Sequence, residues 1–217
     1  MIRMALDTSF EHLSICITKN DSPLVNFFSC SNRKNSEIIF TTINNLLKSI
    51  GIKLGEIDIY IINCGPGSYT GVRIGMAIIK TFAQVFKKPI IPVNSLELIA
   101  GQIKNIKKDF CVLLNCTSRE IFHCNFNIID DYPVSNSPIH LSNLEIFLEK
   151  SNHNSVLLYR VSPEKRAPEP MFEKLNTIKP DLLIPDGILL DSIGAKKLKK
   201  QSFDSMHVQP IYIKREI

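Results

Sequence analysis

The sequence predicts an α/β protein built from two units, and three observations point to this class. Short apolar runs of strand length alternate with longer segments whose apolar residues recur at helical spacing. The first three runs follow one another with short connections, as in an antiparallel meander, whereas helical segments separate the later runs. A length of 217 residues, 44% of them hydrophobic, suffices for one large domain or two small ones.

The first half of the chain has the element order of a ribonuclease-H-like unit. Its predicted elements are strands over residues 2–7, 12–19 and 23–30, a helix over 35–50, a strand over 57–64, a helix over 72–86 and a strand over 90–93. In the first helix, apolar residues recur at helical spacing from Ile39 and Ile43 onward, and Gly51 follows where glycine often ends a helix.

The second half begins near Gly101 and resembles a reduced second copy of this unit. Its predicted elements are strands over 110–115, 120–129 and 156–160, helices over 141–150 and 191–200, and a proline-rich loop over 162–170. We therefore predict a first domain over 1–102 and a second over 103–217, with the C-terminal helix as a candidate to pack back on the first.

A glycine-rich stretch, residues 65–71, joins a predicted strand to a predicted helix. Such a loop can place backbone N–H groups beside a negative group, and Ser68 or Thr70 could cap the helix. Neither phosphate motif fits, because no lysine follows Gly71 and Thr70 stands where the dinucleotide pattern needs its third glycine. The stretch is thus either a ligand loop or a tight turn. The candidate anion-binding residues are Asp7, Gly65, Gly67, Ser68, Thr70 and Gly71.

The helix over 72–86 has two apolar faces. One stripe contains Val72, Met76, Ile79, Ala83 and Phe86, and the other contains Ile74, Ile78, Phe82 and Val85. A helix with two apolar faces packs against more than one layer. The second face is covered either by the helix over 35–50 or by another protein.

Longer motifs resemble those of the TsaB family, the accessory subunits of the bacterial tRNA threonylcarbamoyladenosine machinery. The string from Gly65 to Gly75 matches the family's signature. Stretches 4–9 (ending in Asp-Thr-Ser), 92–97 and 209–215 agree with it in order and spacing, although Lys214 only approximates a basic position. The strong resemblance covers roughly the first hundred residues, and 115–122 match only in part.

The resemblance implies two ribonuclease-H-like units in an actin-like arrangement, the second one reduced. It also implies a non-catalytic cytoplasmic subunit that pairs with and activates a TsaD-like threonylcarbamoyl transferase, which modifies tRNA beside the anticodon. A TsaE-like ATPase is the expected third partner, tRNA is reached through the complex, and a homodimer is the expected alternative when the chain is alone. No tightly bound cofactor is expected, and a nucleotide at the partner interface stays open.

The family pairs its first two helices with those of the partner, which gives a set of candidate interface residues. These are Ile39, Ile43, Ile74, Ile78, Phe82 and Val85. We expect Ile74, Ile78 and Phe82 to form the outward stripe, with Met76, Ile79 and Ala83 as the alternative.

An enzyme in its own right, either metallopeptidase-like or a small ATPase, is the competing hypothesis. Catalytic relatives bind a metal through two histidines on the first helix, but the helix over 35–50 contains none. An ATPase of actin-like fold could use Asp7 near a nucleotide phosphate, but the bulky turn that follows places Glu11 where it would repel phosphate. Cys64 and Ser68 lack the patterns of nucleophiles.

The composition favours a soluble intracellular protein. The chain has no apolar run of membrane-spanning length, no stretch typical of a signal peptide and no Cys-x-x-Cys pair. Its net charge is +5, and lysines cluster over 104–108 and 196–200. Because no aromatic residues interleave with them, these lysines indicate a solvated surface more than direct tRNA contact.

Overall fold

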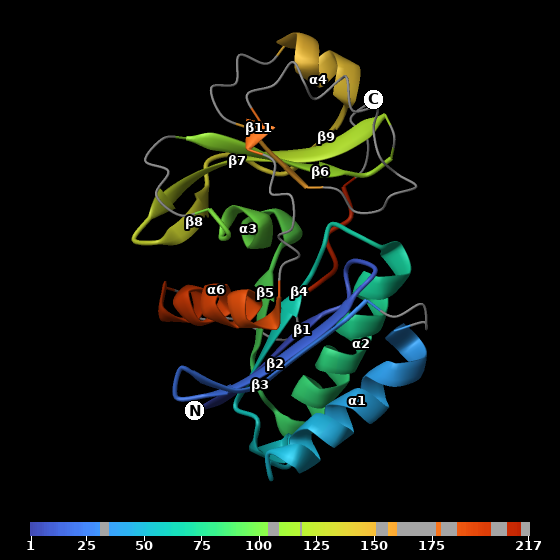
Figure 1. The fold of residues 1–217 in the computed structure, drawn as a ribbon, viewed down its shortest axis with the longest axis vertical. Helices are drawn as coiled ribbons and strands as arrows, with labels where there is room; N and C mark the ends of the chain where they lie inside the picture. Colours follow the sequence, from blue (N-terminus) through green and yellow to red (C-terminus); the bar gives the residue numbers. More distant parts are fainter. Residues whose placement is uncertain are drawn as a thin grey trace. The chain divides into compact units, whose positions relative to one another are not determined.

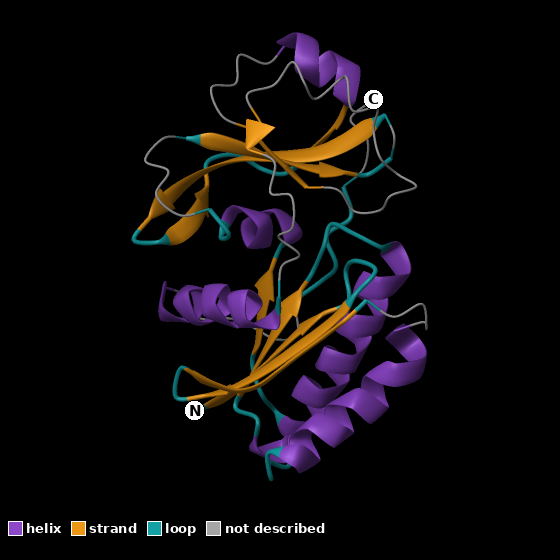
Figure 2. Cartoon of the chain, in the orientation of Figure 1, coloured by secondary structure: helices purple, strands orange, loops and turns teal. Residues whose placement is uncertain are grey.

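The computed structural model divides into two compact units. It describes residues 1–30, 35–103, 109–117, 119–150, 156–159, 177–178, 186–200 and 208–213. The first unit comprises Met1–Ser95 and Pro185–Ile211, and the second comprises Leu96–Ile184 and Tyr212–Ile217. The division thus lies before the predicted boundary at residue 102, and the C-terminal helix belongs to the first unit. Each unit contains its own sheet (Figure 2).

The first unit is built on a five-stranded sheet of order β3-β2-β1-β4-β5. Its strands are β1 (Ile2–Asp7), β2 (Leu13–Lys19), β3 (Ser22–Ser29), β4 (Ile59–Asn63) and β5 (Ile90–Val93). Strands β1, β2 and β3 are antiparallel, whereas β4 and β5 run parallel to β1. This is the ribonuclease-H-like order that the sequence predicted.

Helices cover both faces of this sheet, as Figure 1 shows. Helices α1 (Asn35–Ser49) and α2 (Tyr69–Phe86) lie on one face, and α6 (Gly187–Lys200) lies on the other. A short 3-10 turn, η1 (Leu54–Glu56), precedes β4. Because helices cover it on both sides, every residue of β4 is buried, which explains its continuous apolar run.

The second unit repeats this strand pattern in a sheet of order β11-β10-β6-β7-β8, with β9 also paired to β7. Strands β6, β7 and β8 are antiparallel, and β10 and β11 run parallel to β6. The strands are β6 (Phe110–Asn115), β7 (Glu120–Ile129), β8 (Tyr132–Ser135), β9 (His140–Asn143), β10 (Val156–Tyr159) and β11 (Thr177–Ile178). The helices are α3 (Ser95–Ala100), which starts at the unit boundary, and α4 (Leu144–Lys150).

Sequence periodicity missed several short elements of the second unit. It did not predict α3, β8 or β11, and it placed residues 141–143 in a helix. Those residues instead pair with β7, with Leu141 opposite Phe122, so the helix starts only at Leu144. The lysines at 104–108 and the proline-rich loop at 162–170 lie outside the described residues.

A buried ion pair joins α6 to the sheet of the first unit. The Arg3 side chain on β1 is 2% exposed, and its Nε and Nη2 donate to the two carboxylate oxygens of Asp191 at 2.9 and 2.7 Å. Thr18 Oγ1 donates to the same carboxylate at 3.1 Å. A bidentate pair of this kind fixes the orientation of both side chains.

Close packing accompanies this pair. Gly187 and Gly194 lie on the same side of α6, and a Cβ atom on either would press against Cys16 of β2 or Ile61 of β4. Since only a glycine lets the helix approach so closely, α6 lies directly on the sheet. The helix begins four residues before its predicted start at Asp191, where the Asp186 carboxylate accepts a hydrogen bond from Leu189 N–H at 2.9 Å.

We predict that Asp191→Asn destabilises the protein strongly, because it leaves the Arg3 guanidinium buried without its main counter-charge. The expected loss in the free energy of unfolding is about 3–5 kcal/mol, measured by urea denaturation. Asp21→Asn is the matched control, since Asp21 contacts Arg3 Nη1 at 2.7 Å but its side chain is 70% exposed. The control should change stability little, and equal losses in the two variants would contradict the role given to the buried pair.

Candidate functional site

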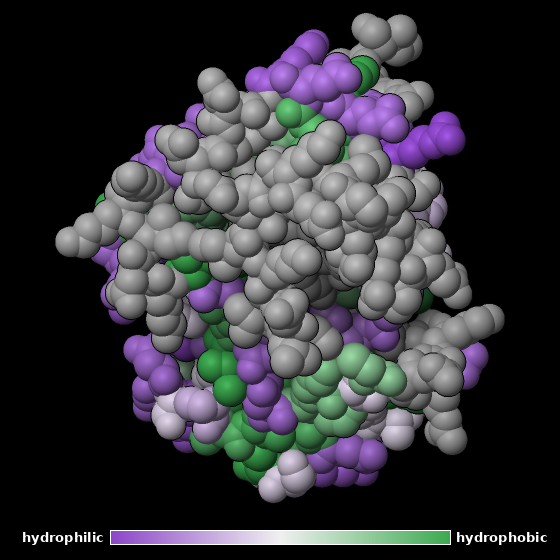
Figure 3. Space-filling model, turned by 45° about the horizontal axis from the view of Figure 1, so that its top comes forward, coloured by the Kyte–Doolittle hydropathy of each residue, from purple (hydrophilic) through white to green (hydrophobic). Residues whose placement is uncertain are grey.

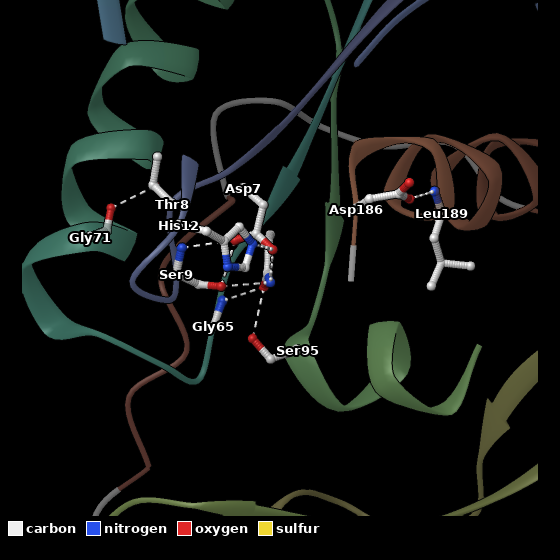
Figure 4. Close-up of polar contacts among 10 residues, drawn as sticks. Asp7, Thr8, Ser9, His12, Gly65, Gly71, Ser95, Asp186 and Leu189 are labelled. Carbon is white, nitrogen blue, oxygen red and sulfur yellow. Dashed lines mark hydrogen bonds and ion pairs between the residues drawn. The ribbon is translucent and has the colours of Figure 1, made fainter. Parts of the chain in front are cut away.

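Asp7, the residue singled out at the end of β1, lies in a buried polar cluster. Asp7, Ser9 and Asn63 are each 0% exposed. The Asp7 carboxylate accepts hydrogen bonds from Ser9 N–H at 2.8 Å, Ser9 Oγ at 2.6 Å and Asn63 Nδ2 at 3.0 Å. Asn63 Oδ1 in turn accepts from Gly65 N–H and Ser95 Oγ, both at 3.0 Å (Figure 4).

His12 completes the surroundings of the Asp7 carboxylate. Its Nε2 lies 3.7 Å from Asp7 Oδ2, and its ring packs between Phe10 and Phe28. Burial raises the pKa of the Asp7 carboxyl, but His12 and the hydrogen bonds from Ser9 lower it more, so the pKa lies below its ordinary value. The carboxylate is therefore ionised, and groups of its own chain surround it.

The glycine loop closes over the turn that follows β1. A Cβ atom on Gly71 would overlap the carbonyl oxygen of Thr8, and a Cβ atom on Gly67 would overlap that of Ser9. Ser68 N–H donates to the Ser9 carbonyl at 2.6 Å, and Thr8 Oγ1 donates to the Gly71 carbonyl at 2.7 Å (Figure 4). The loop thus accommodates the backbone of its own chain.

Two expectations about this loop are resolved differently. Ser68 caps α2, since its Oγ accepts a hydrogen bond from Gly71 N–H at 3.2 Å. Positive φ was the expected reason for glycine at 67 and 71, but among the loop glycines it is Gly65 that has a positive φ, of 90°. Gly67 and Gly71 are needed instead for close approach to the turn.

The arrangement does not fit a nucleotide phosphate. The N–H groups of Gly65, Ser68 and Gly71 already donate within the chain, and Asp7 is enclosed by donors. Of the candidate anion-binding residues, Gly67 and Thr70 are exposed. The structure brings the candidates together, and it uses most of them to hold β1, the turn and α2 in place.

The described histidines and cysteines do not gather into a metal site. Among the described residues, no group of three or more His, Cys, Asp or Glu side chains could hold a metal ion. His123 and His140 face each other on β7 and β9, with ring centroids 5.3 Å apart, whereas residues 153 and 207 lie outside the described part. Cys64 is buried, and its thiol donates to the Val93 carbonyl at 3.2 Å, as in a structural cysteine.

The expected outward stripe of α2 is wrong, because α1 covers it. Ile78 and Phe82 are 6% and 8% exposed and belong to the core of the first unit, and the Phe82 ring contacts those of Phe40 and Tyr60. Ile74 is half-buried. The alternative stripe of Met76, Ile79 and Ala83 is also buried, as are the α1 candidates Ile39 and Ile43. Both apolar stripes of α2 thus serve the chain's own fold.

A different set of residues is exposed on these two helices. The large side chains are Phe40 of α1 and Tyr69 and Val85 of α2, which are 58%, 58% and 65% exposed. Of the predicted interface residues, Val85 alone is fully exposed in the described structure. Sequence periodicity missed Phe40 and Tyr69 because it cannot tell which side of a two-faced helix a neighbouring helix will cover. Hydrophobic residues also reach the surface elsewhere, interspersed with polar ones (Figure 3).

Comparison with known proteins places these features in context. A family model described as TsaD, tRNA N6-adenosine threonylcarbamoyltransferase, matches residues 29–134. The tRNA threonylcarbamoyladenosine biosynthesis protein TsaB of Haemophilus influenzae is 25% identical over 227 aligned positions, which cover 99% of this chain and 94% of that protein. The protein of the same name from Bacillus subtilis is 32% identical over 101 positions, or 46% of this chain and 44% of that protein.

Solved structures confirm the predicted fold class. The structure described as YeaZ from Pseudomonas aeruginosa aligns with a TM-score of 0.78 over 98% of this chain and 99% of that chain, at 16% identity. Among the described residues, no helix is both long and apolar enough to cross a membrane.

We predict that Gly71→Ala destabilises the protein, because its new methyl group would overlap the Thr8 carbonyl oxygen. The expected loss is on the order of 1–3 kcal/mol in the free energy of unfolding, measured by urea denaturation. Thr70→Ala, a change at the exposed neighbouring position, is the control and should stay within about 0.5 kcal/mol of the unchanged protein. Similar stability of all three proteins would show that the loop and the turn do not pack as described.

A second prediction concerns the pH dependence of stability. Because the folded-state pKa of Asp7 is lowered, its carboxylate stabilises the fold above its unfolded-state pKa, and this contribution disappears as the pH falls through the folded-state value. Between about pH 5 and about pH 2 the unchanged protein should therefore lose more stability than Asp7→Asn. Urea unfolding across this range tests the difference, and parallel curves would argue against it.

Proposed function

The chain belongs to the TsaB (YeaZ) family, and on this premise we propose that it is a non-catalytic subunit that binds and activates a TsaD-like threonylcarbamoyl transferase. Its relatives are named for tRNA threonylcarbamoyladenosine biosynthesis, which sets the pathway. The proposal adds the role within it: the partner carries the active site, and this chain orders that partner through a helical interface.

The observation that carries the proposal is the exposed apolar face of α1 and α2. Phe40 and Val85 are 58% and 65% exposed, and the half-buried Ile74 lies between the two helices and the solvent. Large aromatic and aliphatic side chains exposed together mark binding surfaces, where such residues supply much of the binding energy. Two helices presented side by side suit pairing with two helices of a partner, as in a four-helix bundle.

The buried cluster around Asp7 supports a role without catalysis. A catalytic carboxylate must reach a substrate or a bound water molecule. The Asp7 side chain is 0% exposed and accepts three hydrogen bonds from Ser9 and Asn63. Its chemistry is therefore directed at holding the turn after β1, and this favours an accessory subunit over a small ATPase or a metallopeptidase-like enzyme.

The other proposed partners follow from the same premise. We propose that a TsaE-like ATPase joins the complex, that tRNA is bound through the complex, and that the complex works in the cytoplasm. A homodimer of this chain and a nucleotide at the partner interface are alternatives that the same binding experiments examine.

Reconstitution tests the proposed role. The chain, the TsaD-like and TsaE-like subunits of the same source, and unmodified tRNA are combined in the presence of a threonylcarbamoyl donor, and each protein is omitted in turn. We expect modified tRNA only in the full mixture, and a stable complex of this chain with the TsaD-like subunit in gel filtration. Modification at full rate without this chain, or modification by this chain alone, would reject the proposal.

Two substitutions on α2 separate the interface from the core. Val85→Glu places a carboxylate on the exposed face, so it should weaken binding to the TsaD-like subunit by about 2 kcal/mol or more while the melting temperature stays unchanged. Ile78→Glu buries an unpaired carboxylate in the chain's own core and should lower the free energy of unfolding by more than about 4 kcal/mol. A folded Ile78→Glu variant that only loses binding would return Ile78 to the interface.

A further inference from the structure

We propose that the α1–α2 face is selective for an acidic partner surface and disfavours pairing with a second copy of this chain. The inference rests on the proposed function, because it specifies which partner the same face accepts. The charges beside the exposed apolar residues carry it.

Helix α2 separates its exposed apolar and basic residues into two rows. At 3.6 residues per turn, Ile74 and Val85 project within about 20° of each other, and Arg73 and Lys80 do the same on the neighbouring side of the helix. Val85 and Arg73 are exposed, and Ile74 and Lys80 are half-buried. A partner helix that lies on the apolar row therefore has a basic row along one side.

Arg73 is held in a defined position within the basic row. Its Cζ atom lies 3.7 Å from the centroid of the Tyr69 ring, one helical turn away, and both residues are exposed. Stacking restricts the guanidinium, so less side-chain freedom is lost when it binds. The planar guanidinium matches a carboxylate through two parallel hydrogen bonds, which makes an acidic side chain its best partner.

The rest of the face has the same sign of charge. The first turn of α2 contains no acidic residue, so no carboxylate there offsets the positive end of the helix dipole. Together, α1 and α2 contain three basic residues, Lys48, Arg73 and Lys80, and one acidic residue, Glu37, for a net charge of +2.

This charge distinguishes the two classes of partner. A symmetric dimer places the same patch of each copy against the other. Two copies of the α1–α2 face would then bring two sets of basic residues together, which opposes association, whereas an acidic partner surface is complementary. The apolar row supplies affinity to either partner, and the basic row decides between them.

Charge reversal on the basic row tests the inference. The full chain carrying Arg73→Glu and Lys80→Glu is compared with the unchanged chain for binding to the TsaD-like subunit of the same source and for self-association by analytical ultracentrifugation. Lys19→Glu with Lys200→Glu is the matched control, because it makes the same change of charge at two exposed positions outside α1 and α2. Melting curves check that all three proteins are folded.

The expected result is partner binding weakened about tenfold or more and self-association strengthened, with the control unchanged. Partner binding of the unchanged chain should also weaken when salt is raised from about 50 mM to about 500 mM. If Val85→Glu abolishes partner binding but charge reversal does not weaken it, the inference is overturned and the proposed function stands. If the unchanged chain prefers itself to the partner, the inference also falls. If neither kind of substitution affects partner binding, the proposed interface falls with it.

Discussion

Strand β1 carries two buried charges, and the need to satisfy both of them organises the first unit. Arg3 near its start is 2% exposed, and Asp7 at its end is 0% exposed. A buried charge is tolerated only when partners replace the water it has lost. Arg3 is satisfied by Asp191, which lies 188 positions away in the sequence, so α6 must return to the sheet. Asp7 is satisfied by Ser9, Asn63 and His12, so the turn after β1 must close on the end of β4.

The same two requirements explain why the glycine loop is shaped as it is. Once the turn is closed, the carbonyl oxygens of Thr8 and Ser9 occupy the space in front of α2, where a loop of this kind can hold an anion. Carbonyl oxygens are themselves electronegative, so they suit the positive end of a helix. Gly67 and Gly71 let them approach. The chain has kept the geometry of a phosphate loop and filled it with its own backbone, which moves the functional surface elsewhere.

That surface is what remains of α1 and α2 after the fold has used their apolar stripes. The sheet covers one side of α2 and α1 covers another, so Ile78 and Phe82 contribute to stability. Phe40 and Val85 lie beyond this coverage, next to the basic side chains of α2. One helix therefore serves the core with two sides and presents a third side, part apolar and part basic, to solvent. Affinity and selectivity for a partner can then come from adjacent rows of one helix.

The sequence by itself determined the class of fold, most of the elements in the first unit and the family. Strands β1 and β5 and helix α1 were predicted almost to the residue, because their apolar periodicity and the glycine after α1 are local signals. Candidate residues around Asp7 and the glycine loop were also found from motifs, although their roles were not. Short elements such as β9 were missed because four residues carry too little periodicity to be recognised.

Tertiary structure alone decided which residues are buried and with whom they pair. Periodicity shows that α2 has two apolar stripes, but whether α1 covers the stripe containing Ile78 depends on where α1 lies in space. Likewise, nothing local marks Arg3 and Asp191 as partners, because the pairing joins the two ends of the chain. Local sequence encodes the form of an element and its apolar sides. The identity of the neighbour on each side is a property of the assembled unit, and that neighbour determines whether a side chain stabilises the fold or is left exposed for another protein.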